Sequence, residues 1–381
     1  MDFSLSEEQL RGRASVIEFA SANLNVGLAE REASSTFDRA IWKQLADFGV
    51  LKWNIPLEYG GFGHGVVTST LLLEALGYGC RDSGLNLAVA GQMWTVQQPI
   101  ISSGSTEQQA TLLPALGSGS LIGAHAITEP GSGSDTFSLS TVAEPSADGF
   151  RLTGTKALIG MAAVADLLLV FAKTDPDMGH WGISAFLVEV DTPGVDVSTT
   201  HEKMGLRTNP TTTVTFDEAP ISHAAMLGTR GAGVGISTDS LEWERAFILA
   251  WQIGAMERQL EMTIDHAKQR EQFGQPIGRF QSVANRIVDM RLRLETARLL
   301  LYKTAWLKES GRPAQLESAL AKLHIAEEFV ASGLDAVRTF GGIGYLTETG
   351  VERDLRDAVG GLIYGGTSDI QRQVVARLLG L

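Results

Sequence analysis

The sequence predicts an α+β protein, mostly helical, in which two helical regions flank a middle β region. Three observations predict this. Helical periodicity fills residues 1–120, short β-branched and apolar runs fill residues 121–234, and helical periodicity returns over residues 235–381. Strands and helices do not alternate along the chain, so a doubly wound nucleotide-binding fold is not expected. We expect an N-terminal helical domain, a central β domain and a C-terminal helical bundle with these boundaries.

The composition is that of a folded protein without a basic surface. The 381 residues are 44% hydrophobic and 20% charged, and the net charge is −13. Because phosphate backbones are bound by basic surfaces, we expect no nucleic acid partner. The chain has no apolar run long enough to span a bilayer and no signal-peptide pattern, which favours a cytoplasmic location without a membrane partner. Cys80 is the single cysteine, and scattered histidines favour no metal site.

Capping and breaking residues delimit the N-terminal helices. Ser4 and Glu7 have the spacing of a capping box and predict the start of the first helix. A glycine-rich break follows at residues 56–65 (PLEYGGFGHG). Helical character covers three further stretches: residues 37–50, residues 67–76, and a helix that begins at the Ser105–Gln108 spacing and ends near Gly117.

The middle region contains short runs typical of strands, separated by turn residues. Four such runs lie at residues 167–171, 183–190, 195–199 and 211–216. Their regular spacing predicts a small antiparallel sheet or barrel.

A long helix with one apolar seam begins the bundle pattern of the last region. The seam repeats at alternating steps of four and three residues, through Val283, Ile287, Met290, Leu294, Ala297 and Leu301. This repeat is typical of a helix in a bundle.

One acidic residue lies inside an apolar helical stripe. Residues 237–258 read as one helix with the inward face Leu241, Glu244, Ile248, Trp251 and Ala255. A carboxylate removed from water without a partner has a raised pKa and can serve as a general base. The alternative is that Glu244 pairs with an arginine from another helix. The neighbouring Glu242 has Arg245 three residues on as a sufficient partner.

A glycine- and serine-rich turn follows a strand at residues 125–135 (HAITEPGSGSD). Its glycines would allow backbone amides close to a ligand, and Thr128, Ser132 and Ser134 add hydroxyl groups, so a pyrophosphate or a flavin edge could bind there. The turn is not the GxGxxG motif, because Thr136 replaces the third glycine. By itself the pattern is also typical of an ordinary loop.

Several segments resemble the acyl-CoA dehydrogenase family in order and spacing. They are TEPGSGSD (128–135), EKMGLR (202–207), REQFGQPIGRFQ (270–281), FGGIGY (340–345) and IYGGTSDIQR (363–372). The likeness runs from Phe3 to Leu381. It implies the acyl-CoA dehydrogenase fold, FAD between the β domain and a C-terminal four-helix bundle, and a homotetramer.

The resemblance implies two sets of FAD-binding residues. The first set is His125, Ile127, Thr128, Gly133, Ser134, Ile159 and Gly160. The second set is Arg270, Phe273, Gln281, Arg338, Gly341, Gly342, Thr367 and Asp369, with glycines of a neighbouring subunit completing the dinucleotide site. Two positions depart from the family. Gly160 replaces a threonine that contacts the flavin near N5, and Arg338 replaces a glutamine but could still reach a pyrophosphate.

The catalytic acid also departs from the commonest family pattern. Many members carry it in IYEGT, where this chain has Gly365. A minority, among them isovaleryl-CoA dehydrogenases, carry it in a helix with a pattern close to LEWER, which matches Glu244. The resemblance therefore implies that Glu244 takes the α-proton of an acyl thioester while a hydride leaves the β-carbon for flavin N5. Implied substrate contacts are Ser134, Leu241, Arg245, Tyr364 and Gly365.

The substrate expected from the resemblance is a thioester on an acyl or aminoacyl carrier protein in a biosynthetic pathway. The segments around WER, RFQSVANRIVDMRLRLE and ARLLGL are similar to prolyl-carrier-protein dehydrogenases. An acidic carrier would need a basic patch, for which Lys268, Arg270, Lys303 and Lys308 are candidates.

Three alternatives remain open at the level of sequence. They are a short- or branched-chain acyl-CoA dehydrogenase, a flavin monooxygenase of the same fold, and a flavin-binding scaffold without catalysis. The expected electron acceptor is an electron-transfer flavoprotein or oxygen.

Overall fold

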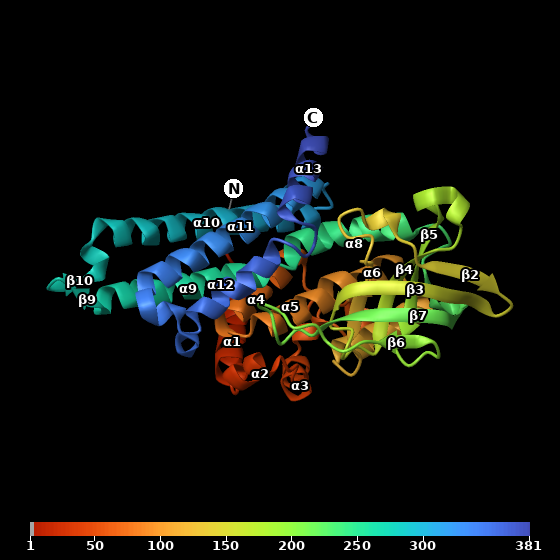
Figure 1. The fold of residues 1–381 in the computed structure, drawn as a ribbon, viewed down its shortest axis with the longest axis horizontal. Helices are drawn as coiled ribbons and strands as arrows, with labels where there is room; N and C mark the ends of the chain where they lie inside the picture. Colours follow the sequence, from red (N-terminus) through yellow and green to blue (C-terminus); the bar gives the residue numbers. More distant parts are fainter. Residues whose placement is uncertain (1–3) are drawn as a thin grey trace.

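The computed structural model describes residues 4–381 and places helices at both ends of the chain around a middle sheet (Figure 1). Residues 1–3, including the expected start of the family likeness at Phe3, lie outside the described residues. The N-terminal part contains α1 (Glu7–Asn23), α2 (Leu28–Ser34), α3 (Arg39–Phe48), α4 (Val66–Gly79), α5 (Ser83–Gly91), the π-helical η3 (Gln92–Gln97), α6 (Gln98–Ser103) and α7 (Thr106–Gly117).

The first helix is capped two residues later than the sequence predicts. Ser6 is the N-cap, and its hydroxyl accepts from the Gln9 amide at 3.1 Å, while the Gln9 side chain accepts from the Ser6 amide at 2.9 Å. The predicted box from Ser4 to Glu7 is therefore wrong. Glu7 instead occupies the first turn, where the helix dipole favours a carboxylate. The predicted helix start at Ser105–Gln108 is confirmed, because these two residues form a reciprocal capping box on α7.

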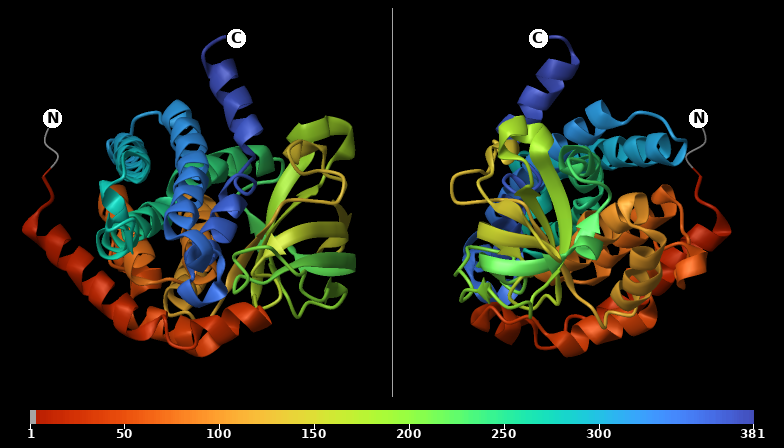
Figure 2. Two further views of the ribbon diagram at one scale, coloured as in Figure 1. Left: turned by 60° about the vertical axis from the view of Figure 1, so that its left-hand side comes forward. Right: turned by 90° about the vertical axis from the view of Figure 1, so that its right-hand side faces the viewer.

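The middle part forms one sheet that packs beside the helices (Figure 2). Its strands are β1 (Gly123–Ala126), β2 (Val142–Ser146), β3 (Gly149–Gly160), β4 (Leu167–Lys173), β5 (Ile183–Glu189), β6 (Val195–Val197), β7 (Thr211–Ser222) and β8 (Met226–Leu227). The order is β6-β7-β3-β2-β4-β5-β8, with β1 on β4. The sheet is mixed, which corrects the antiparallel prediction, because β1 and β2 both pair with β4 in parallel.

The last part contains α8 (Gly233–Phe247), α9 (Ala250–Gln269), the short β9 (Glu271–Gln272) and β10 (Gln275–Pro276), α10 (Gln281–Glu309), α11 (Gln315–Phe340), α12 (Val351–Gly361) and α13 (Ser368–Leu378). In the α10 seam, Met290, Leu294, Ala297 and Leu301 are fully buried. α13 projects from the body of the molecule (Figures 1 and 2). The helix–sheet–helix order confirms the predicted fold class.

The expected single helix over residues 237–258 is broken. The Ile248 amide still donates to the Glu244 carbonyl at 3.1 Å, but the Gln252 amide donates to Leu249 at 2.9 Å. α8 therefore ends one turn after Glu244, and α9 continues in a separate helix.

Two glycines let α9 pack tightly against α4. A Cβ atom on Gly77 would lie 1.9 Å from the Trp251 carbonyl oxygen, and one on Gly254 would lie 1.9 Å from the Glu74 carbonyl oxygen. The two helix backbones are thus in direct contact, which only glycine permits. This contact fixes the start of α9, and with it the end of α8.

Candidate active site

Glu244 is a buried carboxylate without a partner. Its side chain lies on the last turns of α8 and is 9% exposed. Within residues 4–381 the carboxylate forms no ion pair and accepts no hydrogen bond, so the alternative of an arginine from another helix is not found there. Burial raises its pKa to about 7, although the positive charges of Arg245 and Lys322 oppose the rise. Such a group can take up a proton near neutral pH.

Aromatic packing holds this part of α8. The Trp243 ring stacks on Trp94 of η3 with centroids 5.6 Å apart, and Phe247 meets Trp94 at 5.2 Å. Because the three rings lock one face of the helix, the direction of the Glu244 side chain is fixed by packing rather than by an ion pair.

Gly365 lies beside the Glu244 carboxylate. A Cβ atom on Gly365 would be 3.5 Å from Oε1 of Glu244 and 3.8 Å from its Cγ. Gly365 has a φ of +66°, a conformation that favours glycine. A side chain at position 365 would therefore be in contact with the Glu244 carboxylate.

Three buried side chains hold the segment from Gly361 to Gly366. Lys322 of α11 donates to the Gly361 carbonyl at 2.7 Å, and Gln252 of α9 donates to the Tyr364 hydroxyl at 3.0 Å. Gln371 of α13 donates to the carbonyls of Gly365 at 3.0 Å and Gly366 at 3.1 Å. Sequence reasoning missed all three. The only sequence signal is Lys322, a cation within the apolar pattern of residues 318–326.

The turn held by Gln371 presents free backbone donors. In the described part of the chain, the amides of residues 365–367 donate no hydrogen bond. In a trans peptide the N–H points away from the C=O, so carbonyls directed at Gln371 turn the next amides to the opposite side. These amides are available to a ligand oxygen.

The expected ion pair of Glu242 and the candidate basic patch both differ from the structure. Glu242 does not pair with Arg245 but with Lys308, at 2.8 Å, and the Lys308 ammonium lies 4.4 Å above the Trp243 ring. Arg245 keeps a buried Nε without a hydrogen-bond partner. Lys303 pairs with Glu317 at 3.1 Å. Two of the four residues of the candidate basic patch, Lys303 and Lys308, are therefore paired with acids.

A buried ion pair anchors the glycine- and serine-rich turn to the sheet. Lys156 of β3 donates to Glu129 at 2.8 Å. Burial opposes ionisation of Glu129, but Lys156 and the hydroxyls of Thr141 and Ser140 outweigh it and lower its pKa to about 2. The turn therefore leaves the sheet from a fixed point.

The first set of expected cofactor residues fits FAD. His125 has a buried Nε2 without a partner, and burial, with Lys156, lowers its pKa to about 4, so the ring is neutral. Gly133 has open space around it and Ser134 is exposed, while Ile127 and Ile159 are buried and Thr128 is half-buried. A Cβ atom on Gly160 would lie 3.1 Å from Oδ1 of Asn209. Unpaired polar atoms and open backbone beside apolar side chains suit a flavin.

The second set of expected FAD-binding residues lies in separate parts of the chain's fold. Arg270, Phe273 and Gln281 lie at the β9–β10 hairpin, at the opposite end of the molecule from β3 (Figure 1). Phe273 is 94% exposed, and Gly341 and Gly342 are exposed with open space around them. Arg338 is exposed and pairs with Asp335, and Asp369 pairs with Arg372, both at 3.4 Å. Thr367 caps α13. One chain therefore does not bring the two sets together.

The remaining expected contacts lie around Glu244. Leu241 is half-buried one turn earlier on α8, and Tyr364 directly precedes Gly365. Among residues 4–381, no helix is long and apolar enough to cross a membrane.

Comparison with known proteins agrees with this geometry. The N-terminal, middle and C-terminal domains of acyl-CoA dehydrogenase match residues 6–120, 124–219 and 231–380. The chain belongs to the acyl-CoA dehydrogenase family. An L-prolyl-(peptidyl-carrier protein) dehydrogenase of Pseudomonas fluorescens is 42% identical over 382 residues, which cover 100% of both chains.

Two solved structures of the family are also similar. The prolyl acyl carrier protein oxidase AnaB has a TM-score of 0.98 and 43% identity, covering 99% of this chain and 100% of AnaB. The FAD complex of PigA has a TM-score of 0.97 and 39% identity, covering 100% of both chains. The family relationship confirms the expectation of an oxidoreductase that uses FAD.

Proposed function

We propose that this acyl-CoA dehydrogenase family member removes two hydrogens from an acyl or aminoacyl thioester with Glu244 as the base. The observation that carries the proposal is the unpaired, buried carboxylate of Glu244 beside Gly365, with a pKa of about 7. A base with this pKa is half ionised at neutral pH, where a general base is most effective.

The residues of this chain have separate tasks in the reaction. Glu244 takes the proton from the α-carbon onto a carboxylate oxygen. The free amides of residues 365–367 stabilise the negative charge that grows on the thioester oxygen, as an oxyanion hole does. Gln371 keeps those amides in place through the carbonyls of Gly365 and Gly366. FAD, when bound, would supply the hydride acceptor for the β-carbon.

The proposed substrate is carried on a carrier protein rather than on coenzyme A. The names of the L-prolyl-(peptidyl-carrier protein) dehydrogenase and of AnaB, both similar over almost the whole chain, support this choice. A compact acyl group suits the absence of a side chain at Gly365, whose Cβ would lie 3.5 Å from Oε1 of Glu244. A short or branched acyl-CoA is the alternative.

The proposed assembly is a homo-oligomer, and a tetramer by analogy with the family. One chain leaves the β9–β10 hairpin, with Arg270, Phe273 and Gln281 of the second set, at the far end from β3, so another copy would complete each FAD site. Apolar side chains are exposed along one face of α10, namely Val288 (65%), Leu292 (59%), Leu299 (52%) and Trp306 (52%). Covering such a stripe would bury apolar area.

Three further assignments belong to the same proposal. The domain boundaries are placed at residues 120/121, between α7 and β1, and at residues 234/235, in the first turn of α8. The electron acceptor is an electron-transfer flavoprotein or oxygen, and AnaB is named an oxidase. The location is cytoplasmic.

The test is anaerobic bleaching of the flavin by a panel of thioesters. Acyl and aminoacyl groups are presented on carrier protein and on coenzyme A, to the wild type, Glu244→Gln and Asp239→Asn. Asp239 is an exposed acid on the same helix and serves as the matched control. Bleaching by a carrier-bound thioester should fall by about 10²–10⁴-fold in Glu244→Gln and stay unchanged in Asp239→Asn.

Other results of the bleaching test would change the proposal in different ways. Bleaching only by coenzyme A thioesters would replace the carrier substrate and keep the base. Bleaching that survives in Glu244→Gln would overturn the role of Glu244. A yellow protein that no thioester bleaches would favour the scaffold alternative, and oxygen inserted into the product would favour the monooxygenase.

A further inference from the structure

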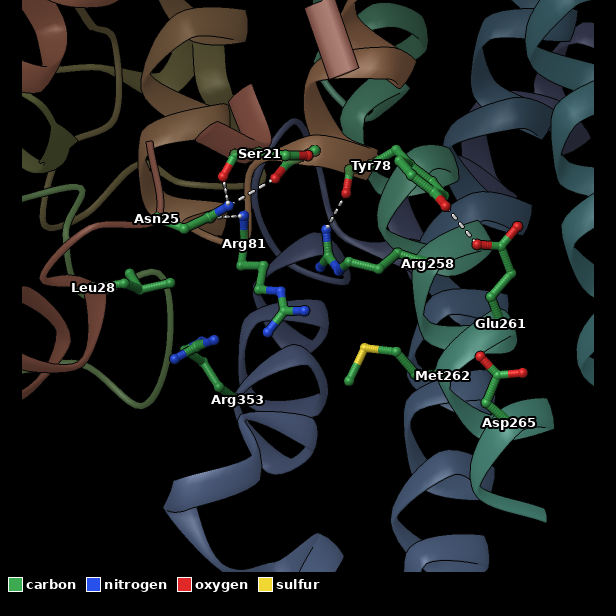
Figure 3. Close-up of a pocket in the computed structure, with 11 residues that line it drawn as sticks. Ser21, Asn25, Leu28, Tyr78, Arg81, Arg258, Glu261, Met262, Asp265 and Arg353 are labelled. Atoms are coloured by element: carbon green, nitrogen blue, oxygen red, sulfur yellow. Dashed lines mark hydrogen bonds between the residues drawn. The ribbon is translucent and has the colours of Figure 1, made fainter. Parts of the chain in front are cut away.

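A cavity of about 580 Å³ lies between the two helical parts of the chain, outside the candidate active site. Its walls come from the C-terminal end of α1, the end of α4 with the loop after it, α9 and α12. The charged lining residues are Arg81, Arg258 and Arg353 with Glu261 and Asp265, and Met262 lies between them (Figure 3). The volume is within the range of small-molecule sites.

Arg258 is already used by the fold. It pairs with Asp354 at 3.3 Å and donates to the carbonyls of Gly77 at 2.5 Å, Tyr78 at 3.1 Å and Cys80 at 3.3 Å. It therefore closes the end of α4 and has little capacity left for a ligand.

Arg81 and Arg353 are not used in this way. In the part of the chain that the structure describes, neither guanidinium forms an ion pair or a hydrogen bond. Nε of Arg353 is buried without a partner. The Arg81 backbone is fixed, because its amide donates to Asn25 at 2.7 Å, and Asn25 in turn donates to the Gly79 carbonyl at 2.9 Å. Both guanidinium groups extend into the same space in Figure 3.

The positive charge of Arg353 acts on Arg81. The pKa of Arg81 is lowered by burial first, and then by the positive charges of Arg258 and Arg353, while Asp354 opposes them. Holding like charges together costs free energy, which an anion between them would offset. Each guanidinium offers a planar fork of N–H donors that matches a carboxylate or a phosphate.

We infer that Arg81 and Arg353 form a binding site for the carboxylate or phosphate group of a small molecule. The acids of the cavity limit what else the ligand carries. Glu261 accepts from the Tyr78 hydroxyl at 2.5 Å, and Asp265 is exposed one turn further along α9. Both lie across Met262 from the arginines in Figure 3, so a second anionic group there would be repelled. The ligand therefore carries one anionic end and an apolar or cationic remainder.

The charge of the whole protein makes the site selective. The net charge is −13, so most of the surface repels anions. Two unpaired guanidinium groups on one side of the cavity supply positive charge that attracts an anion to that side. The site is separate from Glu244 and does not depend on the proposed reaction.

Isothermal titration of the FAD-loaded enzyme with inorganic phosphate and with butyrate tests the inference. Arg81→Gln and Arg353→Gln are compared with Arg151→Gln, whose arginine is exposed on β3 of the sheet domain. We expect saturable binding of at least one probe, weakened tenfold or more in Arg81→Gln and Arg353→Gln, unchanged in Arg151→Gln, and weakened by added NaCl.

Saturable binding of phosphate or of butyrate supports the site, and the probe that binds more tightly identifies the oxyanion that the site prefers. Binding of neither probe overturns it, as does equal binding by wild type and Arg81→Gln. Arg81 is the deciding position because its exposed side chain supports no contact within the fold, so its loss leaves the folded enzyme intact for titration.

Discussion

Glu244→Gln is expected to stabilise the folded protein at alkaline pH while it removes activity. Burial raises the pKa of this carboxyl from 4.5 to about 7. The folded protein thus holds the proton more tightly than the unfolded chain, and ionisation of Glu244 opposes folding. The cost is absent below about pH 4.5, grows as the pH rises, and is complete above about pH 7. Because one pKa unit corresponds to about 1.4 kcal/mol, the full cost is about 3 kcal/mol.

The assay is thermal unfolding of the FAD-loaded wild type and Glu244→Gln at about pH 5 and about pH 8.5. A glutamine carries no charge, so the variant escapes the cost. For a chain of 381 residues, we expect its Tm to exceed the wild-type Tm by about 4 °C at the higher pH, with little difference at the lower. Asp239→Asn controls for loss of an exposed acid from α8. An equal difference at both pH values would refute the reasoning, as would a variant less stable than wild type at the higher pH.

Three further predictions concern the same region. For the wild type, we expect kcat/KM to rise about tenfold per pH unit up to about pH 7, the pKa of Glu244. In Lys322→Met, loss of the positive charge that lowers this pKa should move the rise to higher pH. Coincident pH profiles from initial rates would contradict this. The double change Glu244→Gly with Gly365→Glu should regain part of the flavin bleaching that is lost in Glu244→Gly. Its folded state should be about 1 kcal/mol less stable, because residue 365 then carries a side chain at positive φ. A double variant as inactive as the single one would show that the two positions do not share one space. Gln371→Leu should lower kcat by about tenfold to a hundredfold with little change in KM, because the amides it orients act mainly on developing charge. A larger effect on KM than on kcat in steady-state assays would speak against that role.

The order of helices and sheet could be predicted because periodicity is a local property of sequence. The strand β3 was missed although it is 12 residues long. Its pairing with β7 shifts register between Leu152 and Gly154 and again between Lys156 and Ile159, so its side chains do not alternate regularly. The parallel pairing of β1 with β4 joins segments about 44 residues apart in sequence, and no local pattern encodes it.

The candidate base could be found from sequence because a carboxylate in an apolar stripe is a local conflict. Its surroundings could not be found in this way. Lys322, Gln252 and Gln371 lie on three different helices, and each looks like an ordinary polar residue until the chain is folded. The same limit explains the wrong pairing of Glu242, since its partner Lys308 is 66 positions away and only tertiary packing brings it to 2.8 Å.

The absence of a side chain at position 365 and the acid at position 244 depend on each other physically. The Glu244 carboxylate lies 3.5 Å from where a Cβ of residue 365 would be, so a second carboxylate there would meet the first in a space with little water. Two buried carboxylates that close would share a proton, and one of them would stay neutral at physiological pH. With glycine at 365, that position places no second carboxylate beside Glu244, and burial raises the Glu244 pKa against the charges of Arg245 and Lys322. The positive φ of Gly365 and the hydrogen bond from Gln371 to its carbonyl then only orient the backbone amides. The division of labour between a base on α8 and amide donors on the loop before α13 follows from this arrangement.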